Sequence, residues 1–347
     1  MEVLIRTEGR AGRITLNRPE ALNALSHPMS LAIEAALDGW RDDPGVALVL
    51  IDAEGTRAFC AGGDIATIHA QITAGDLASP RKFWRDEYRM NAKIAEYPKP
   101  VVALMQGFVM GGGVGIGCHA GIRIVGKTTR VAMPECAIGL IPDVGGSLLL
   151  ARAPGRFGAY LGLTGTRMGP GDAIDMGFAD LFVPEAEWPD LAADLARSGD
   201  PGVIADYMEG GPAGRLRHRQ ERVDAIFSAA TVAEILARLD ADGTEQAVEA
   251  AAAMRAASPL SLAVTLECQR RLGRTASVRE ALALEYRFTW RAPEASDLVE
   301  GIRALIVDKD RRPRWRHPAA EAVGADEVAA LLAPLGADEL VFEEKKA

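Results

Sequence analysis

The sequence predicts an α/β protein that ends in a mostly helical part. Over residues 1 to about 185, short apolar runs alternate with stretches of helical periodicity, as strands separated by helices do. A strand, a glycine-rich loop and a helix follow one another twice, first after residues 46–51 and again after residues 101–105. From about residue 186, alanine-rich amphipathic stretches replace the strand-like runs. These observations predict repeated ββα-like units and a helical C-terminal part.

The first elements are bounded by turn residues. Residues 14–16 are expected to form a strand, because Asn17, Arg18 and Pro19 follow the apolar run. Residues 28–40 have the pattern of a helix, which Pro44 and Gly45 prevent from continuing. The uninterrupted apolar run at 46–51 predicts a buried strand.

The next elements repeat this order. Residues 80–96 are expected to form a helix that ends before Pro98 and Pro100. Residues 101–105 form the next apolar run, and residues 122–125 and 131–133 predict two more short strands.

The second half is predicted to be helical. Its amphipathic stretches cover residues 188–198, 231–239, 245–257 and 260–272, with a break near 210–212. We therefore expect a core of residues 1–199, which carries the site, and a helical part of residues 200–347. The charged residues 343–346 are expected to form a solvated tail.

Composition excludes several classes of function. A net charge of −9 over 347 residues argues against general binding to nucleic acid or to anionic membranes. The chain starts with no signal-peptide pattern and has no uncharged apolar run of about 18 residues, so we expect a soluble, cytoplasmic protein. Its four cysteines and five histidines have no metal-ligand spacing, and Cys60 and Cys136 are interpreted as buried thiols.

Residues 133–146 are the most informative segment for function. Glu135 and Asp143 lie eight residues apart in apolar sequence, among prolines and glycines that restrict the backbone. A carboxylate in such surroundings is costly unless it has partners or a chemical role. The segment therefore predicts a pair of functional acids.

Two upstream glycine clusters complete the pattern, at residues 60–65 and 110–115. Glycine lets a backbone N–H approach a ligand with no side chain in the way. Two converging amides and a carboxylate pair suit reactions that pass through an enolate or a tetrahedral oxyanion.

Four motifs in order then resemble the crotonase (enoyl-CoA hydratase/isomerase) superfamily. They are Leu16-Asn17-Arg18-Pro19-Glu20-Ala21-Leu22-Asn23-Ala24-Leu25, Ala58-Phe59-Cys60-Ala61-Gly62-Gly63-Asp64-Ile65, Gly107-Phe108-Val109-Met110-Gly111-Gly112-Gly113, and Pro134-Glu135 with Ile138-Gly139. The resemblance implies the crotonase-type ββα spiral. It also implies that the amides of Gly63 and Gly112 stabilise the oxyanion of an acyl-CoA thioester.

The resemblance further implies which residues contact coenzyme A. The backbone from 58 to 65 is expected to bind its adenine and pantetheine, through Ala58, Ala61, Gly62, Asp64 and Ile65. Nearby basic residues are candidates for its phosphates, namely Arg57, Arg81, Lys82 and Arg85. Coenzyme A is part of the substrate, and neither a metal nor a redox cofactor is expected. Hydratases of the superfamily form trimers and hexamers, so a homo-oligomer is possible.

Two positions resemble one branch of the superfamily, the 3-hydroxyisobutyryl-CoA hydrolases. Gly115 stands where hydratases usually have a second glutamate, and Asp143 stands where they usually have glycine. Motifs at 258–262, 284–287, 300–304 and 308–315 agree with this branch. The resemblance implies hydrolysis of a 3-hydroxyacyl-CoA.

The roles of the two acids stay open between alternatives. Glu135 is expected to act as nucleophile or as general base on water. Asp143 is expected to bind the substrate's 3-hydroxyl group or to orient the water. Two other functions compete with hydrolysis: an enoyl-CoA hydratase or isomerase that uses Glu135 alone, and a catalytically silent acyl-CoA-binding protein.

Overall fold

The computed structural model describes residues 1–342, so the predicted tail at 343–346 lies outside the described residues. Within this range the chain divides into two compact units that interleave along the sequence. Unit 1 contains residues 1–64, 86–132 and 167–217, and unit 2 contains residues 65–85, 133–166 and 218 onward. The predicted division at residue 199 stays a prediction.

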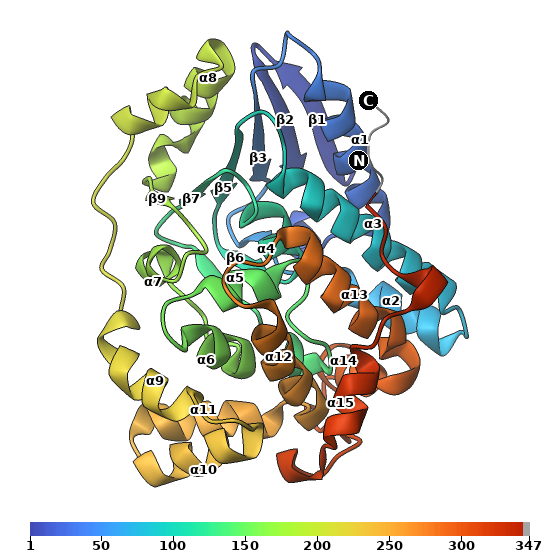
Figure 1. Ribbon diagram of the computed structural model, residues 1–347. Helices are drawn as coiled ribbons and strands as arrows, with labels where there is room; N and C mark the ends of the chain where they lie inside the picture. The colour runs from blue at the N-terminus through green and yellow to red at the C-terminus, as the bar shows by residue number, and fades with distance from the viewer. Residues whose placement is uncertain (343–347) are drawn as a thin grey trace. The chain divides into compact units, whose positions relative to one another are not determined.

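All strands of the described chain belong to unit 1 (Figure 1). They are β1 (Val3–Glu8), β2 (Ala11–Leu16), β3 (Leu48–Ala53), β4 (Ala58–Cys60), β5 (Val101–Met105), β6 (Phe108–Met110), β7 (Ile122–Val125), β8 (Arg130–Ala132) and β9 (Leu181–Phe182).

The strands form two sheets whose order explains the sequence repeat. A six-stranded sheet has the order β1-β2-β3-β5-β7-β9, and a three-stranded sheet has the order β4-β6-β8. Only the β1–β2 pair is antiparallel. The pairs β3/β4, β5/β6 and β7/β8 each send one strand to each sheet. This is the predicted ββα spiral.

Helices account for most of the remaining chain. They are α1 (His27–Arg41), α2 (Ile65–Thr73), α3 (Ala78–Ala95), α4 (Gly112–Gly117), α5 (Gly146–Arg152), α6 (Phe157–Thr164), α7 (Pro170–Asp175), α8 (Trp188–Ser198), α9 (Gln220–Phe227), α10 (Val232–Asp242), α11 (Glu245–Ala256), α12 (Pro259–Leu272), α13 (Val278–Ala295), α14 (Leu298–Ile302) and α15 (Ala325–Leu331). No helix in the described part is both long and apolar enough to cross a membrane.

Helices cover the six-stranded sheet in unit 1. Leu191 and Leu195 of α8 pack into a cluster with Leu50, Val102 and Ile124 of the strands. These strands carry apolar residues at nearly every position because they are buried in the interior. The observed core therefore agrees with the continuous apolar runs in the sequence.

The described residues of unit 2 form helices joined by turns and loops, and none of them forms a strand. Helices α12, α13 and α15 pack against one another, and α12 also packs against α5 and α6 (Figure 1). Helix α13 begins with a capping box in which Ser277 and Glu280 satisfy each other's backbone amides. The predicted C-terminal helices 188–198, 231–239, 245–257 and 260–272 are confirmed as α8, α10, α11 and α12.

Candidate active site

The two amides predicted to bind an oxyanion lie together in unit 1. Strands β4 and β6 are parallel neighbours, so the loops that follow them leave the same edge of their sheet. A Cβ placed on Gly112 would lie 3.4 Å from the amide nitrogen of Gly63. A larger residue at 112 would thus crowd the second amide.

Neither amide is used in the backbone hydrogen bonds of the described fold. Gly112 is the first residue of α4, where backbone N–H groups have no partner within the helix. Neither Gly63 nor Gly112 donates a backbone hydrogen bond among residues 1–342. Two adjacent unpaired donors are compatible with the predicted binding of an oxyanion, which stays a prediction.

The backbone predicted to contact coenzyme A is held by the first motif. The amides of Ala61 and Asp64 donate to the carbonyls of Leu22 and Leu25, at 3.1 and 2.8 Å. The carbonyl of Gly62 accepts from the amide of Leu25 at 2.8 Å. This pairing fixes the path of residues 61–64.

Asn23 and Arg18 of the first motif hold the neighbouring segments in place through their side chains. The amide group of Asn23 donates to the carbonyls of Glu54 and Ala58, each at 2.9 Å. Arg18 contacts the carboxylate of Asp64 at 3.2 Å. Ile65 begins α2. Ala61, Gly62 and Asp64 thus lie in one braced loop, and Ala58 lies in β4 just before it. The contact of these residues with coenzyme A stays a prediction.

Glu135 is a buried acid at the start of a short 3₁₀ helix, Glu135–Ile138. Its side chain is 5% exposed, and its Oε2 atom has no hydrogen-bond partner in the described structure. A buried carboxyl oxygen without a partner is costly, and such groups concentrate at functional sites. The predicted special character of Glu135 agrees with this environment.

Asp143 lies beside Glu135 on a tight turn. Its side chain is also buried. The next two residues, Val144 and Gly145, both have positive φ angles, 53° and 78°. A β-branched residue rarely adopts this conformation, which costs of order 1–3 kcal/mol. The strained turn directs Asp143 to the place where it interacts with Glu135.

Sequence reasoning missed a third acid, Glu285 of α13. Its carboxylate is fully buried and accepts hydrogen bonds from the amides of Gly145 at 2.7 Å and Ser147 at 3.0 Å. It also contacts the Ser147 hydroxyl group. The motif at 284–287 contained this residue, but no local signal links it to a turn 138 residues earlier.

Burial and nearby charges oppose the ionisation of Glu135 and Glu285. Burial raises the pKa of Glu135 well above its ordinary value, and the charges of Asp143 and Glu285 raise it further. Burial also raises the pKa of Glu285 to about 8, against the lowering effect of its hydrogen bonds. Glu285 therefore holds a proton at neutral pH, and Glu135 has the raised pKa that suits a general acid or base.

A second acid that sequence reasoning missed is Glu87 of α3. It is buried, and its Oε1 atom would lie 2.9 Å from a Cβ placed on Gly112. A carboxyl group therefore lies beside the predicted oxyanion amide. In sequence it follows Arg85 and Asp86, where an acid is usually part of a solvent-facing helix surface.

The other candidate residues have structural roles or lie at the surface. All four cysteines are buried, and burial raises the pKa of Cys60 and Cys136 to about 12, which confirms that they are buried thiols. Arg81 pairs with Glu294 at 2.5 Å and lies over the ring of Trp290. The side chains of Arg57, Lys82 and Arg85 are exposed.

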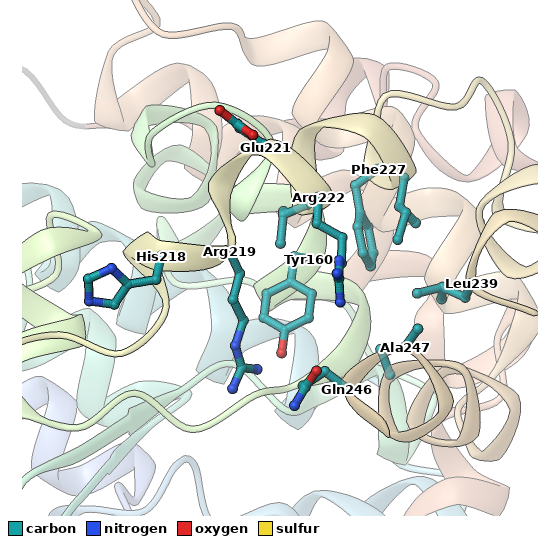
Figure 2. Close-up of a pocket in the computed structure, with 12 residues that line it drawn as sticks. Tyr160, His218, Arg219, Glu221, Arg222, Phe227, Leu239, Gln246 and Ala247 are labelled. Atoms are coloured by element: carbon teal, nitrogen blue, oxygen red, sulfur yellow. The ribbon is translucent and has the colours of Figure 1, made fainter. Parts of the chain in front are cut away.

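A separate surface pocket of about 370 Å³ lies in unit 2 between α6, α9 and α11 (Figure 2). Apolar residues such as Phe227 and Leu239 line it together with Tyr160, Arg219 and Gln246. None of the predicted site residues lines it. Among residues 1–342, no group of three or more His, Cys, Asp and Glu side chains is arranged to hold a metal ion.

The fold and the motifs agree with the comparisons. The sequence matches the enoyl-CoA hydratase/isomerase family over residues 11–332, and the chain belongs to this crotonase family of acyl-CoA enzymes. The crystal structure of an enoyl-CoA hydratase from Rhodobacter sphaeroides 2.4.1 is 61% identical, covers 99% of this chain and 100% of its own, and has a TM-score of 0.95. That of a carnitinyl-CoA dehydratase from Mycobacterium thermoresistibile is 42% identical, covers 99% of both chains and has a TM-score of 0.94.

Curated relatives have a different name. The mitochondrial 3-hydroxyisobutyryl-CoA hydrolases of Gallus gallus and Homo sapiens are 39% and 37% identical over 98% of this chain, and the match spans 90% and 91% of their own lengths. The 3-hydroxyisobutyryl-CoA hydrolase 1 of Arabidopsis thaliana is 39% identical over 90% of this chain and 86% of its own. A cytoplasmic location stays a prediction for this chain.

Proposed function

We propose that the chain hydrolyses a 3-hydroxyacyl-CoA thioester, specifically 3-hydroxyisobutyryl-CoA, to 3-hydroxyisobutyrate and coenzyme A, a step of valine breakdown. The pairing of Glu135 with Asp143 carries the proposal. Glu135 has a buried oxygen without a partner, and Asp143 lies close enough to raise its pKa. Gly115 leaves α4 without the second glutamate that hydration of a double bond uses.

The amides of Gly63 and Gly112 are proposed to receive the thioester oxygen. As the carbonyl carbon becomes tetrahedral, this oxygen gains negative charge and its hydrogen bonds strengthen. Loss of one such donor typically slows acyl transfer by about 10²–10³-fold. The unpaired state of both donors supports this role.

Glu135 acts in one of two ways. As a general base it takes a proton from water, whose oxygen attacks the carbonyl carbon; the C–S bond then breaks and the thiolate is protonated. As a nucleophile its own oxygen attacks the carbonyl carbon, and the C–S bond breaks to release coenzyme A as a thiolate that is then protonated. Water hydrolyses the resulting mixed anhydride, which releases the acid and restores the Glu135 carboxyl group. The raised pKa favours a group that exchanges protons near neutral pH.

Asp143 is proposed to bind the 3-hydroxyl group of the substrate or to orient the attacking water. After burial, its charge is the next largest cause that raises the pKa of Glu135. The names of the hydrolase relatives support the substrate class, since those proteins match nearly the whole chain.

An enoyl-CoA hydratase is the second candidate, because the structure with 61% identity bears that name. Free-thiol release from 3-hydroxyisobutyryl-CoA, followed alongside the ultraviolet absorbance of crotonyl-CoA, separates the two. We expect thiol release by the wild type and its loss in Glu135→Gln and Asp143→Gly. Loss of enoyl absorbance without thiol release would identify a hydratase, and binding without turnover would identify a silent acyl-CoA-binding protein.

A further inference from the structure

We propose that Glu285 is a positioning residue for the Glu135/Asp143 pair, because it holds the turn that carries Asp143. The inference rests on the proposed function and extends it to a residue 138 positions away from that turn. Glu285 does not act on the reacting atoms in this account. It determines where Asp143 lies and how readily the pair ionises.

Both carboxylate oxygens of Glu285 bind the turn. Oε2 accepts from the amide of Gly145 at 2.7 Å, and Oε1 accepts from the amide of Ser147 at 3.0 Å and contacts its hydroxyl group. Helix α5 begins at Gly146, so these are amides that the helix itself leaves unpaired. Glu285 thus serves as a cap supplied by a distant helix.

The turn needs such a restraint. Val144 and Gly145 both have left-handed backbone angles, and Asp143 immediately precedes them. The carbonyl of Asp143 accepts from the amide of Gly146 at 2.6 Å, which closes the turn on one side. The bonds to Glu285 fix the amides on the other side, so a change at Glu285 displaces Asp143.

Glu285 is also electrically coupled to the pair. Within unit 2, the titratable groups that interact with Glu285 include Asp143, Glu135 and the thiol of Cys268. Glu135 in turn interacts with the thiol of Cys136. A group that served only to stabilise the fold elsewhere would have no such coupling to the pair.

The test substitutes Glu285→Gln and follows thiol release from 3-hydroxyisobutyryl-CoA across pH. Glutamine keeps the shape of the side chain, but it has only one acceptor oxygen and turns an NH₂ group toward one of the amides. We expect kcat to fall by roughly 10- to 100-fold, as expected for a displaced catalytic group. KM should change less than kcat, because Glu285 does not contact the substrate.

The pH profile is the readout that a purely structural role would not move. The charge of Glu285 raises the pKa of Glu135, and Glu285→Gln removes this charge. The acid limb, which the apparent pKa of Glu135 governs, should therefore shift to lower pH. The profile should also lose one ionisation. Overall destabilisation would lower activity at all pH values and leave the limb in place.

Asp172→Asn is the matched control. Asp172 is a buried acid in unit 1 that accepts from the amides of Arg215 and Leu216 at 2.6 and 2.8 Å, so it makes the same kind of bond. We expect its variant to lose stability and keep the kcat and pH limb of the wild type. Ser147→Ala removes one donor to Glu285 and tests the inference if Glu285→Gln does not fold; its kcat should fall a few-fold.

The outcomes separate the two hypotheses. Wild-type kcat and an unmoved acid limb in both Glu285→Gln and Ser147→Ala would overturn the positioning role. A wild type that releases no thiol but hydrates crotonyl-CoA would instead overturn the proposed function. In that case the same variants are compared on the hydration reaction, where an unmoved kcat and limb again overturn the positioning role.

Discussion

Burial of the Glu135 carboxyl group lowers the stability of the folded protein when the group is ionised. The same burial gives Glu135 the raised pKa on which its proposed role depends. Its burial raises the pKa, so the ionised form destabilises the folded state. We expect Glu135→Gln to lower thiol release by about 10²–10⁴-fold, because the proton-transferring group is lost. As the pH rises to 9, the same variant should lose less stability than the wild type, because glutamine cannot acquire an unfavourable buried charge.

Chemical denaturation at pH 9, together with steady-state kinetics, checks both parts of this prediction. Glu96→Gln, at an exposed position near the end of α3, serves as a control that changes net charge equally. A Glu135→Gln protein with substantial activity would show that Glu135 is neither base nor nucleophile.

The buried acids also predict how stability depends on pH. For Glu285 the pKa rises from 4.5 to about 8 on folding. The folded state therefore binds more protons than the unfolded state between these values, and stability falls as pH rises through this window. For one proton the slope reaches about 1.4 kcal/mol per pH unit.

Urea unfolding from pH 5 to pH 8 measures this slope. Glu285→Gln should flatten it, because glutamine does not titrate. A stability that rises steadily over this range in the wild type would contradict the raised pKa values of both Glu135 and Glu285.

At the scale of elements, the glycines of α4 let this helix pack on β4. A Cβ on Gly113 would overlap the carbonyl oxygen of Cys60. We expect Gly113→Ala to cost about 1–3 kcal/mol of unfolding free energy, as overpacking does. Gly39, in helix α1, has open space around it, so Gly39→Ala should stabilise by roughly 0.5–1 kcal/mol.

Thermal unfolding of the two variants compares the same substitution in two helices. The expected changes in stability have opposite signs. Gly113 is needed for close packing, whereas Gly39 only lowers the helix propensity of α1. Equal effects would mean that α4 has room to move away from β4.

The elements that could be predicted from sequence are those with long periodic or apolar runs. The strand at 101–105 and the helix at 28–40 were predicted within a residue or two of β5 and α1. Strands β4 and β6 were missed because each is short and runs directly into a glycine cluster that was interpreted as a loop. Helix α13 was missed although it is long.

The buried acids divide in the same way. Glu135 and Asp143 could be found because their apolar surroundings are local in sequence. Glu285 and Glu87 could not, because each acquires its role from a partner in another segment: the turn after Asp143, and Gly112. The local sequence pattern identifies acids that lie in apolar sequence. Tertiary contacts determine which other acids are buried, and the sequence pattern does not contain these contacts.

At the scale of the whole molecule, segments of the two units alternate along the sequence. Unit 2 is assembled from residues 65–85, 133–166 and the C-terminal segment from 218. A change in composition along the sequence marks the boundary where the helical half begins. It does not show which earlier segments pack against that half. The interleaving is a property of contacts alone.

This interleaving predicts that residues 1–199 will not fold cooperatively on their own. Within unit 2, Cys136 contacts Thr265 at 3.3 Å, and Gln269 donates to the carbonyl of Gly158 at 3.1 Å. Phe157 of α6 is fully buried, and α6 packs against α12. A fragment that ends at 199 would expose this apolar surface and leave the 145–147 amides without Glu285.

Denaturant unfolding of the 1–199 fragment, alone and co-expressed with residues 200–347, tests this. We expect no cooperative transition for the fragment alone and a cooperative one for the pair, because the second fragment restores the buried surface of α5 and α6. Thiol release should return only in the pair. A fragment that unfolds cooperatively alone would support instead an autonomous core ending at residue 199, in which the helical part is an addition and Glu285 is dispensable for the fold of the 143–147 turn.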